Sequence, residues 1–366
     1  MNEIKVVHID TQDTWRGGQR QVIELIRRLT GRGVTNILAC KTASEISRKA
    51  VELGIPVIHY PFHGEWDIVS AMKLRAYIKR EKIQIVHVHS SHAHMIAIIA
   101  LYKLRMCRLI VSRRVDFHIR SFFSRKYKYG AGVAKIIAVS DAIKRVLIED
   151  GINPGSIVTI RSGFVIENFA ESSMTRDIRE ELGIPGDATV IATVAALAPH
   201  KAHYALIKAA YHVVKKHPDV IFLLAGEGEM RSQIERDIHS LGLRSSVKLL
   251  GFVDEVGAVY QAADIFAISS REEGLCSSLF DAMYFNLPIV ATSAGGIPEI
   301  VMDNVNGFIV PVDDYISFAN RLNYLIENVD ERKKMGARST MILKNNTIDQ
   351  TVDTTLDVYR EVLVKS

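Results

Sequence analysis

Two acidic residues, Glu273 and Asp281, lie eight positions apart where a predicted strand passes into a predicted helix. The apolar run 265–270 is typical of a buried strand, and Glu273 follows its carboxyl end. Open α/β sheets bind ligands in the crevice outside the carboxyl ends of their strands. A carboxylate there accepts hydrogen bonds from vicinal hydroxyls, and such charge-assisted bonds are stronger than neutral ones. The pair therefore indicates a site for the hydroxyls of a sugar.

The helix that carries Asp281 favours an anion at its start. It is expected to begin at Ser277 or Ser278, because an N-cap hydroxyl accepts a hydrogen bond from a free backbone N–H, and to end before Pro288. The remaining N–H groups attract a phosphate. Phosphate at the helix start and sugar at the carboxylates together describe a nucleotide-sugar. Cys276, which would line this site, is interpreted as a packed small residue rather than a nucleophile.

The acidic pair is followed by the sequence GGIPE at 295–299. This combination resembles the donor site of the family 4 glycosyltransferases, whose signature is E-x7-E followed by G-G-x-P-E. The resemblance implies the GT-B fold, an α/β fold of two Rossmann-like, doubly wound parallel-sheet domains facing a cleft. It implies that Glu273 binds the transferred sugar, Asp281 the ribose, and Ser277 and Ser278 the diphosphate. It further implies retention of anomeric configuration, no metal and no cofactor, with the nucleotide-sugar donor as substrate. Asp281 in place of Glu shortens the reach by one methylene.

A cation follows the first predicted strand of the second half. The family carries G-R-L there with a Lys a few residues on, and both cations hold the diphosphate. Here Lys201 matches the Lys, whereas Ala196 replaces the Arg. Losing one cation weakens stabilisation of the charge that develops on the departing diphosphate, although Arg16, His200 or His203 could compensate. We expect Lys201 to serve donor binding and catalysis, with a plain surface residue as the alternative.

Paired glycines, Gly17 and Gly18, precede a predicted helix after the first strand. Glycine lets a ligand approach the backbone closely at a helix start. The pair lacks the third glycine of a dinucleotide fingerprint, which disfavours a nicotinamide-dependent dehydrogenase. It resembles the family loop that faces the donor phosphates, and a simple tight turn is the alternative. Arg16, beside it, is either an acceptor contact or a surface residue.

Four histidines cluster in the segment 87–94, where a predicted strand ends. A zinc site is disfavoured, because the spacing fits no closed tetrahedral set. His89 matches the family histidine near the sugar hydroxyls and the bond that breaks. It is therefore the third candidate catalytic residue, with Glu273 and Lys201, while His87 is interpreted as a buried structural histidine.

Two further loops of the second half resemble family loops. Residues 251–253 resemble the loop whose backbone edges the nucleotide base, which makes Val253 a donor-side candidate. Residues 226–228, Gly-Glu-Gly, resemble a family turn and are interpreted mainly as a strand-to-helix connection. For residues 251–253, a simple turn is the alternative.

The segment 105–129 holds eight Lys and Arg against one Asp, interleaved with aromatic residues. Such a composition suits an anionic membrane surface or an anionic acceptor. Nucleic acid is disfavoured, because no recognised nucleic-acid module surrounds it. Arg113 and Arg114, at a predicted strand end, are the best acceptor-side candidates. A solvated surface is the alternative.

The chain alternates predicted strands with amphipathic helices in two similar halves, which indicates two doubly wound parallel sheets. The predicted domains are 1–165 on the acceptor side and 188–346 for the nucleotide-sugar, joined by a linker at 166–187. The terminal helix, 347–366, crosses back to the first domain in this family. The predicted strands are 4–10, 36–41, 56–60, 83–89, 108–115, 135–140 and 156–163, then 188–197, 219–226, 246–251, 263–270, 288–294 and 306–312.

Composition bounds the compartment and the partners. At 366 residues the chain suits two domains, because single cores rarely grow beyond about 250–300 residues. Three scattered cysteines suggest a reducing compartment. The start, MNEIKVVHID, predicts a strand rather than a signal peptide, and the longest apolar run, 95–101, is far below the ~20 residues of a spanning helix. We expect a cytoplasmic protein, able to bind the cytoplasmic membrane face.

Charge divides between the halves. Residues 1–170 hold 27 Lys and Arg against 14 Asp and Glu, and residues 171–366 hold 19 against 27. This asymmetry suggests different partners for the two halves, with drift in surface composition as the alternative. It favours an anionic, lipid-linked acceptor for the first domain.

We therefore expect a transferase that moves a sugar from a UDP- or GDP-linked donor to a hydroxyl of a carbohydrate or glycolipid, in lipopolysaccharide or other cell-surface glycan synthesis. A sugar-nucleotide epimerase on the same scaffold is one alternative, because fold does not determine function. A degenerate, non-catalytic binding partner is the other, motivated by Ala196 and Asp281.

Overall fold

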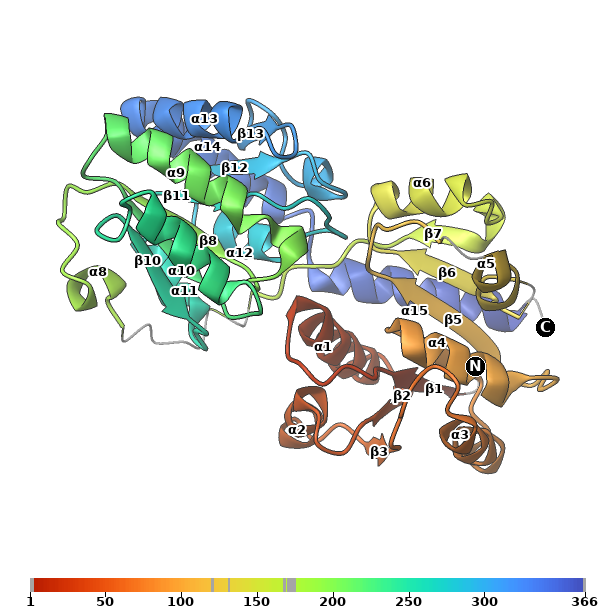
Figure 1. Cartoon of the computed structure of the whole chain (residues 1–366). Helices are drawn as coiled ribbons and strands as arrows, with labels where there is room; N and C mark the ends of the chain where they lie inside the picture. The colour runs from red at the N-terminus through yellow and green to blue at the C-terminus, as the bar shows by residue number, and fades with distance from the viewer. Residues whose placement is uncertain (1–2, 120–121, 131, 167–168, 170–175, 365–366) are drawn as a thin grey trace. The chain divides into compact units, whose positions relative to one another are not determined.

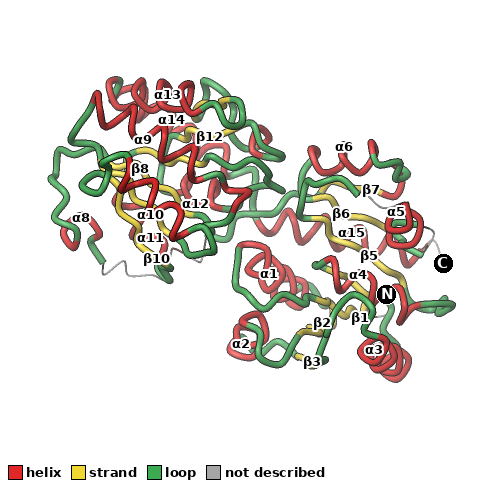
Figure 2. The backbone as a smooth tube through the Cα atoms, viewed as in Figure 1, coloured by secondary structure: helices red, strands yellow, loops and turns green. Residues whose placement is uncertain are grey.

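The computed structural model describes residues 3–119, 122–130, 132–166, 169 and 176–364. It divides into two compact units: unit 1 comprises residues 1–163 with 347–366, and unit 2 comprises residues 164–346. Each unit contains one parallel sheet with helices packed on it (Figure 1; strands are yellow and helices red in Figure 2). The predicted fold class, two Rossmann-like doubly wound parallel sheets, is confirmed.

The sheet of unit 1 has seven strands in the order β3-β2-β1-β4-β5-β6-β7. The order reverses between β1 and β4, so the connections that leave these two neighbours run to opposite sides. Such a reversal opens a crevice at the carboxyl ends of the strands. The strands are β1 (Ile4–Ile9), β2 (Val34–Cys40), β3 (Val57–His59), β4 (Ile85–Val88), β5 (Arg108–Arg113), β6 (Lys135–Ala138) and β7 (Ile157–Thr159).

Amphipathic helices cover this sheet. In α1 the residues Val22, Ile26 and Leu29 recur at helical spacing and are fully buried. The start of α3 is capped by Asp67, whose side chain accepts a hydrogen bond from Ser70 N. The helices are α1 (Gly17–Gly31), α2 (Glu45–Glu52), α3 (Ile68–Glu81), α4 (Ser91–Leu101), α5 (Phe122–Lys128) and α6 (Asp141–Glu149).

The terminal helix α15 (Ile348–Val364) belongs to unit 1 and packs against α1. Arg28 of α1 and Arg32, which follows that helix, both pair with Asp349, but such partly exposed ion pairs contribute at most about 1 kcal/mol each. Burial of apolar side chains such as Val352 contributes more, about 1.5–3 kcal/mol each. Apolar packing therefore holds the helix in place.

The sheet of unit 2 has six parallel strands in the order β10-β9-β8-β11-β12-β13, with the reversal between β8 and β11. Short apolar runs such as Ile265–Ile268 are buried throughout, as expected for strands covered on both faces. The strands are β8 (Val190–Val194), β9 (Ile221–Ala225), β10 (Val247–Gly251), β11 (Ile265–Ile268), β12 (Ile289–Thr292) and β13 (Gly307–Val310).

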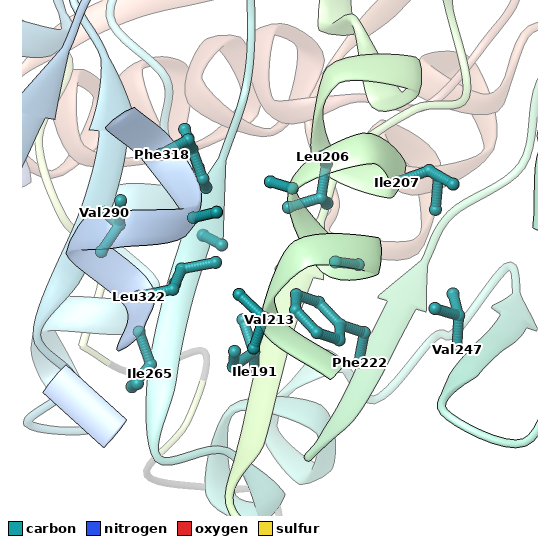
Figure 3. Packing of buried hydrophobic residues seen from close by; sticks show 14 of the residues in the cluster. Ile191, Leu206, Ile207, Val213, Phe222, Val247, Ile265, Val290, Phe318 and Leu322 are labelled. Atoms are coloured by element: carbon teal, nitrogen blue, oxygen red, sulfur yellow. The ribbon is translucent and has the colours of Figure 1, made fainter. Parts of the chain in front are cut away.

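One core of unit 2 lies between its sheet and helices α9 (His203–Lys216) and α13 (Tyr315–Glu327). Leu206 of α9 and Leu322 of α13 point towards strand residues such as Ile191 and Val290 (Figure 3). The other helices are α8 (Ile178–Glu181), α10 (Arg231–Ser240), α11 (Val256–Ala262), α12 (Ser278–Tyr284) and α14 (Val329–Leu343). Among the described residues, no helix combines the length and apolar composition that crossing a bilayer requires.

Twelve of the thirteen predicted strand segments contain an observed strand, usually a shorter one, and the remaining segment, 36–41, overlaps β2, which begins earlier at Val34. The prediction of a capping serine at α12 is wrong in its chemistry. Ser277 precedes the helix, but its side chain makes no capping hydrogen bond, because its backbone is already helical (φ −62°, ψ −26°) rather than extended. Of the predicted linker 166–187, residues 167–168 and 170–175 lie outside the described residues.

Candidate functional site

The predicted site residues follow the strands that flank the order reversal in each unit. In unit 2, Lys201 comes after β8 and Glu273 after β11; in unit 1, Gly17 and Gly18 come after β1 and His89 after β4. Carboxyl ends of parallel strands meet at one edge of a sheet, and ligands bind where the order reverses. Each unit thus has one cluster of candidate residues at the position where a ligand site is expected.

Lys201 and Glu273 form the charged centre of the cluster in unit 2. The Lys201 ammonium donates to Glu273 Oε1, and the Ser270 hydroxyl donates to the same oxygen at 2.9 Å. Glu273 is buried, with 8% of its surface exposed. Burying a charged group without partners is costly, and these two donors offset that cost. The arrangement therefore presents an oriented carboxylate beside a cation, which suits a ligand that carries both hydroxyls and phosphate.

Hydrogen bonds join the loops around this pair. The Ser269 hydroxyl donates to the carbonyl of Lys201 at 3.1 Å, and Arg271 N donates to the carbonyl of His200 at 2.8 Å. Gly296 N, in the predicted GGIPE loop, donates to the carbonyl of Glu273 at 3.2 Å. The loops after β8, β11 and β12 therefore support one another and hold the pair in place before any ligand binds.

The remaining donor-side candidates of unit 2 lie around the start of α12 and in the loop after β10. Asp281 is buried in the first turn of α12, while Ser277 and Ser278, at its start, are half-buried. Cys276 is packed, as predicted, and burial raises the pKa of its thiol to about 12, which opposes nucleophilic chemistry. The side chain of Val253 packs in a core cluster, so it is not available for contact with a ligand.

The Gly-Glu-Gly turn supports the loop before Lys201. An ideal Cβ on Gly226 would lie 1.9 Å from the carbonyl oxygen of Ala195, and one on Gly228 would lie 2.4 Å from that of Leu197. Neither position can carry a side chain without moving the backbone. This geometry agrees with the interpretation of 226–228 as a strand-to-helix connection.

In unit 1, Gly17 and Gly18 form the first residues of α1, and exposed Arg16 precedes them. The N-cap makes no side-chain hydrogen bond and the first turn holds no acidic residue. An ideal Cβ on Gly18 would sit in ordinary contact with Arg114, 3.7 Å from its Cδ. The helix start is thus chemically suited to an anion.

His89 lies in a buried network with two other histidines. His8 Nδ1 is 3.1 Å from His89 Nε2, and His8 Nε2 is 3.0 Å from Asn36 Oδ1. His87, which is fully buried, bonds through Nδ1 to the hydroxyl of Tyr359 at 2.7 Å. Burial lowers the pKa of His8 to about 4 and the pKa values of His87 and His89 well below the usual 6.5. All three imidazoles are therefore neutral at pH 7.

The same histidines are the one group among the described residues whose spacing could hold a metal ion. Their ligand atoms lie within 4.8 Å of one another. Five of the six ring nitrogens, however, already have protein partners, the fifth being His87 Nε2 with Ser112 Oγ at 2.8 Å. The geometry favours a hydrogen-bonded network over a metal centre.

Arg113 and Arg114 differ in their surroundings. Arg113 is buried and donates to the carbonyl of Phe117 at 2.6 Å, so it holds the loop after β5. Arg114 is half-buried, its contact with Ser162 Oγ is long at 3.5 Å, and burial lowers its pKa to about 10. Arg114 is consequently the better placed of the two for an anionic ligand.

The basic segment 105–129 is only partly described. Its residues 120–121 lie outside the described residues, as do the side chains of Phe122 and Phe123. Phe117 and Tyr127 are exposed, with 52% and 56% of their surfaces accessible. Of the basic residues whose side chains are described, Arg105 is exposed, Arg108, Arg114 and Arg125 are half-buried, and Arg113 and Lys128 are buried. The described part of the segment therefore exposes aromatic rings more than positive charge.

Sequence reasoning missed three residues that the structure joins to the candidates: His8, Asn36 and Ser270. A histidine within the apolar run of β1 was the available signal for His8, because buried strands rarely carry one without a partner. Its alignment with His87, its direct register partner on β4, required the sheet order. Ser270 was visible only as the last residue of a predicted strand.

Family models of glycosyltransferases match the sequences of both units. The family model described as "Glycosyltransferase Family 4" matches residues 15–168, and the model "Glycosyl transferases group 1" matches residues 174–340. A UDP-Gal:alpha-D-GlcNAc-diphosphoundecaprenol alpha-1,3-galactosyltransferase of Escherichia coli is 23% identical over 385 residues, covering 99% of this chain and 98% of the enzyme.

Solved structures share the fold. A glycosyltransferase from Rickettsia africae ESF-5 has a TM-score of 0.89 at 21% identity and covers all of both chains. The Anabaena protein HepE in complex with UDP has a TM-score of 0.86 at 20% identity, covering 98% of this chain and 100% of that one. These likenesses span both units.

Proposed function

This chain belongs to the family 4 glycosyltransferases, and we propose that it transfers a sugar from UDP to a saccharide carried on a lipid-linked diphosphate, with retention of anomeric configuration. The Escherichia coli relative is named for UDP-Gal and a diphosphoundecaprenol-linked acceptor, and HepE is solved with UDP. Both names support a UDP-linked donor for this chain. The basic composition of residues 1–170 supports an anionic acceptor.

The observation that carries the proposal is the Lys201–Glu273 pair at the order reversal of unit 2. On binding, the carboxylate of Glu273 accepts hydrogen bonds from hydroxyls of the transferred sugar. Lys201 and the start of α12 neutralise the diphosphate, whose charge grows as the bond to the sugar breaks. No covalent step is assigned to the protein: positioning and stabilisation of the leaving group carry the reaction.

The first experiment is a thermal-shift screen of UDP-galactose, UDP-glucose, UDP-N-acetylglucosamine and GDP-mannose. A ligand at a hundredfold excess over its Kd stabilises the folded protein by about 2.7 kcal/mol, which raises the Tm measurably. The best donor is then incubated with a synthetic diphospholipid-linked N-acetylglucosamine, and the anomer of the product is read by NMR. No shift with any UDP-sugar would refute the proposal.

Two neighbouring glutamates provide a matched control. Glu273→Gln removes the charge from the buried carboxylate, and transfer should fall about tenfold to a hundredfold. Glu272→Gln changes an exposed neighbour and should leave the rate unchanged. Equal rates for both variants would contradict the role given to Glu273.

The same assay separates the alternatives. An epimerase would convert the donor sugar without any acceptor, and a non-catalytic partner would bind the donor without turnover over an acceptor panel. Activity that survives EDTA would support metal-independent transfer, and activity that EDTA abolishes would refute it. Sedimentation with anionic but not zwitterionic vesicles would support a membrane contact through 105–129 and a place at the cytoplasmic membrane face. Absence of sedimentation with anionic vesicles would contradict both.

A further inference from the structure

A buried chain of hydrogen bonds links Asn36 of β2 to His8 of β1 and on to His89. The side-chain nitrogen of Asn36 lies 2.9 Å from the carbonyl oxygen of Val34 and 3.4 Å from that of Ile26. Carbonyl oxygens only accept, so this end of the amide must be the NH₂ group. The amide oxygen is consequently the atom that faces His8 Nε2 at 3.0 Å.

The orientation of Asn36 determines the tautomer of both imidazoles. His8 Nε2 must carry a proton, because the amide oxygen opposite it can only accept. Burial lowers the pKa of His8 to about 4, so the ring is neutral and its Nδ1 holds a bare lone pair. His89 Nε2, 3.1 Å from that lone pair, must then be the protonated nitrogen of His89. The two rings stack with their centroids 5.4 Å apart, which maintains this geometry.

This tautomer leaves His89 Nδ1 as a lone pair with no hydrogen-bond partner among the residues that the structure describes. His89 is 94% buried, and the burial that lowers its pKa keeps Nδ1 unprotonated. A buried acceptor without a donor costs free energy, which a ligand that supplies a donor recovers. His89 follows the carboxyl end of β4, one of the two strands between which the strand order reverses. Ligands of such sheets bind at this position.

We propose that His8 and Asn36 are positioning residues that hold His89 in the tautomer whose bare Nδ1 accepts a hydrogen bond from a hydroxyl of the donor sugar. The inference rests on the proposed function, which supplies the sugar. The opposite tautomer would point an N–H at the same hydroxyl and reverse the direction of the bond. His87 stays outside this chain of bonds, because its partners are Tyr359 and Ser112.

The tautomer is measured directly on the full chain labelled with ¹⁵N-histidine, because the ¹⁵N chemical shift distinguishes a bare ring nitrogen from a protonated one. Wild type should show His89 protonated on Nε2 and bare on Nδ1. His8→Phe keeps a stacked ring but removes the acceptor, and should convert His89 to a mixture of tautomers. His8→Gln offers an acceptor and a donor again and should restore the wild-type pattern.

Thr30→Val is the matched control. It removes one exposed neighbour of Asn36, while the two backbone carbonyls still orient the amide, so His89 should keep its tautomer. A wild-type His89 protonated on Nδ1 would overturn the proposal. So would a His8→Phe spectrum identical to wild type. Should His8→Phe fail to fold, the wild-type and His8→Gln spectra decide alone.

Kinetics with UDP-glucose and UDP-galactose as probes then test the consequence. His8→Phe should lower kcat/KM about tenfold and His8→Gln should recover most of it, while Thr30→Val stays at the wild-type value. Equal kcat/KM for all variants would overturn the role in sugar binding. If neither probe binds wild type, the proposed function fails instead, and the tautomer measurement still stands because it needs no substrate.

Discussion

Acidification from pH 8 to pH 5 should remove most of the stability of unit 1. Five histidines fold in buried, neutral form: His8, His87, His89 and His94 in unit 1, and His203 in unit 2. Burial lowers their pKa values to about 4 for His8 and His203, to about 3 for His94, and well below 6.5 for the other two. The stabilisation from a lowered histidine pKa is complete above 6.5 and is lost as the pH falls towards the folded-state value, because only the unfolded chain takes up the proton.

The size of the loss follows from the same linkage. At pH 5, a histidine whose folded-state pKa is about 4 or lower costs about 2 kcal/mol relative to pH 8. His8 and His94 in unit 1 together cost about 4 kcal/mol, and His87 and His89 add to this loss, whereas the one histidine in unit 2 costs about 2 kcal/mol. A whole domain is stable by only about 5–15 kcal/mol. Burial raises the pKa of Asp10, whose protonation in the folded state offsets a small part of this loss. Unit 1 should therefore unfold first.

The two tryptophans of the chain, Trp15 and Trp66, both belong to unit 1, so their fluorescence during urea titration reports on that unit. His94→Gln should reduce the difference in unfolding free energy between pH 8 and pH 5 by about 2 kcal/mol. His92→Gln, an exposed position on the same helix α4, should leave that difference unchanged. A wild-type difference below about 2 kcal/mol, or equal behaviour of the two variants, would refute the reasoning.

Three other outcomes are expected. Lys201→Met removes the cation that pairs with the buried Glu273 carboxylate and should destabilise unit 2 by about 3 kcal/mol in calorimetry. Adding Glu273→Gln should recover much of this loss, and a double variant no more stable than Lys201→Met would contradict the pairing. Gly163→Ala places a Cβ 2.3 Å from the Cα of Ile348 and should lower the unfolding free energy of unit 1 by at least about 2 kcal/mol in urea titration. A variant as stable as wild type would show that α15 shifts freely. Cys276 should resist iodoacetamide at pH 8 in the native protein, and mass spectrometry that finds rapid alkylation would contradict its burial.

The existence of the thirteen strands was predictable, because each is a short apolar run between polar or turn residues. Their ends were less so. The predicted run 188–197 continues past Val194 in sequence, yet pairing stops there, because residues 195–197 turn to meet the 226–228 connection. Apolar composition thus predicts burial, whereas the end of a strand depends on which backbone groups find partners across the sheet.

The candidate site was predictable one residue at a time but not as pairs. Lys201 and Glu273 were each assigned to the donor by resemblance, whereas their ion pair depends on β8 and β11 being neighbours. The histidine network likewise needs the register that aligns His8 with His87. Contacts between residues 72 or 81 positions apart follow from sheet order, which periodicity does not reveal.

The replacement at Ala196 bears on whether the chain is an active transferase or a non-catalytic relative. The loop that holds Ala196 is fixed by its neighbours: Leu197 N donates to the carbonyl of Glu227 at 3.0 Å, and Gly226 lies too close to Ala195 to carry a side chain. None of these contacts uses the side chain at 196, so the absence of Arg removes a charge without moving the loop. The cation that remains, Lys201, is already oriented beside Glu273. Because leaving-group stabilisation is a sum of several electrostatic contributions, losing one lowers the rate and does not abolish it. The local geometry therefore favours a working transferase with a weakened hold on the diphosphate over a protein that only binds.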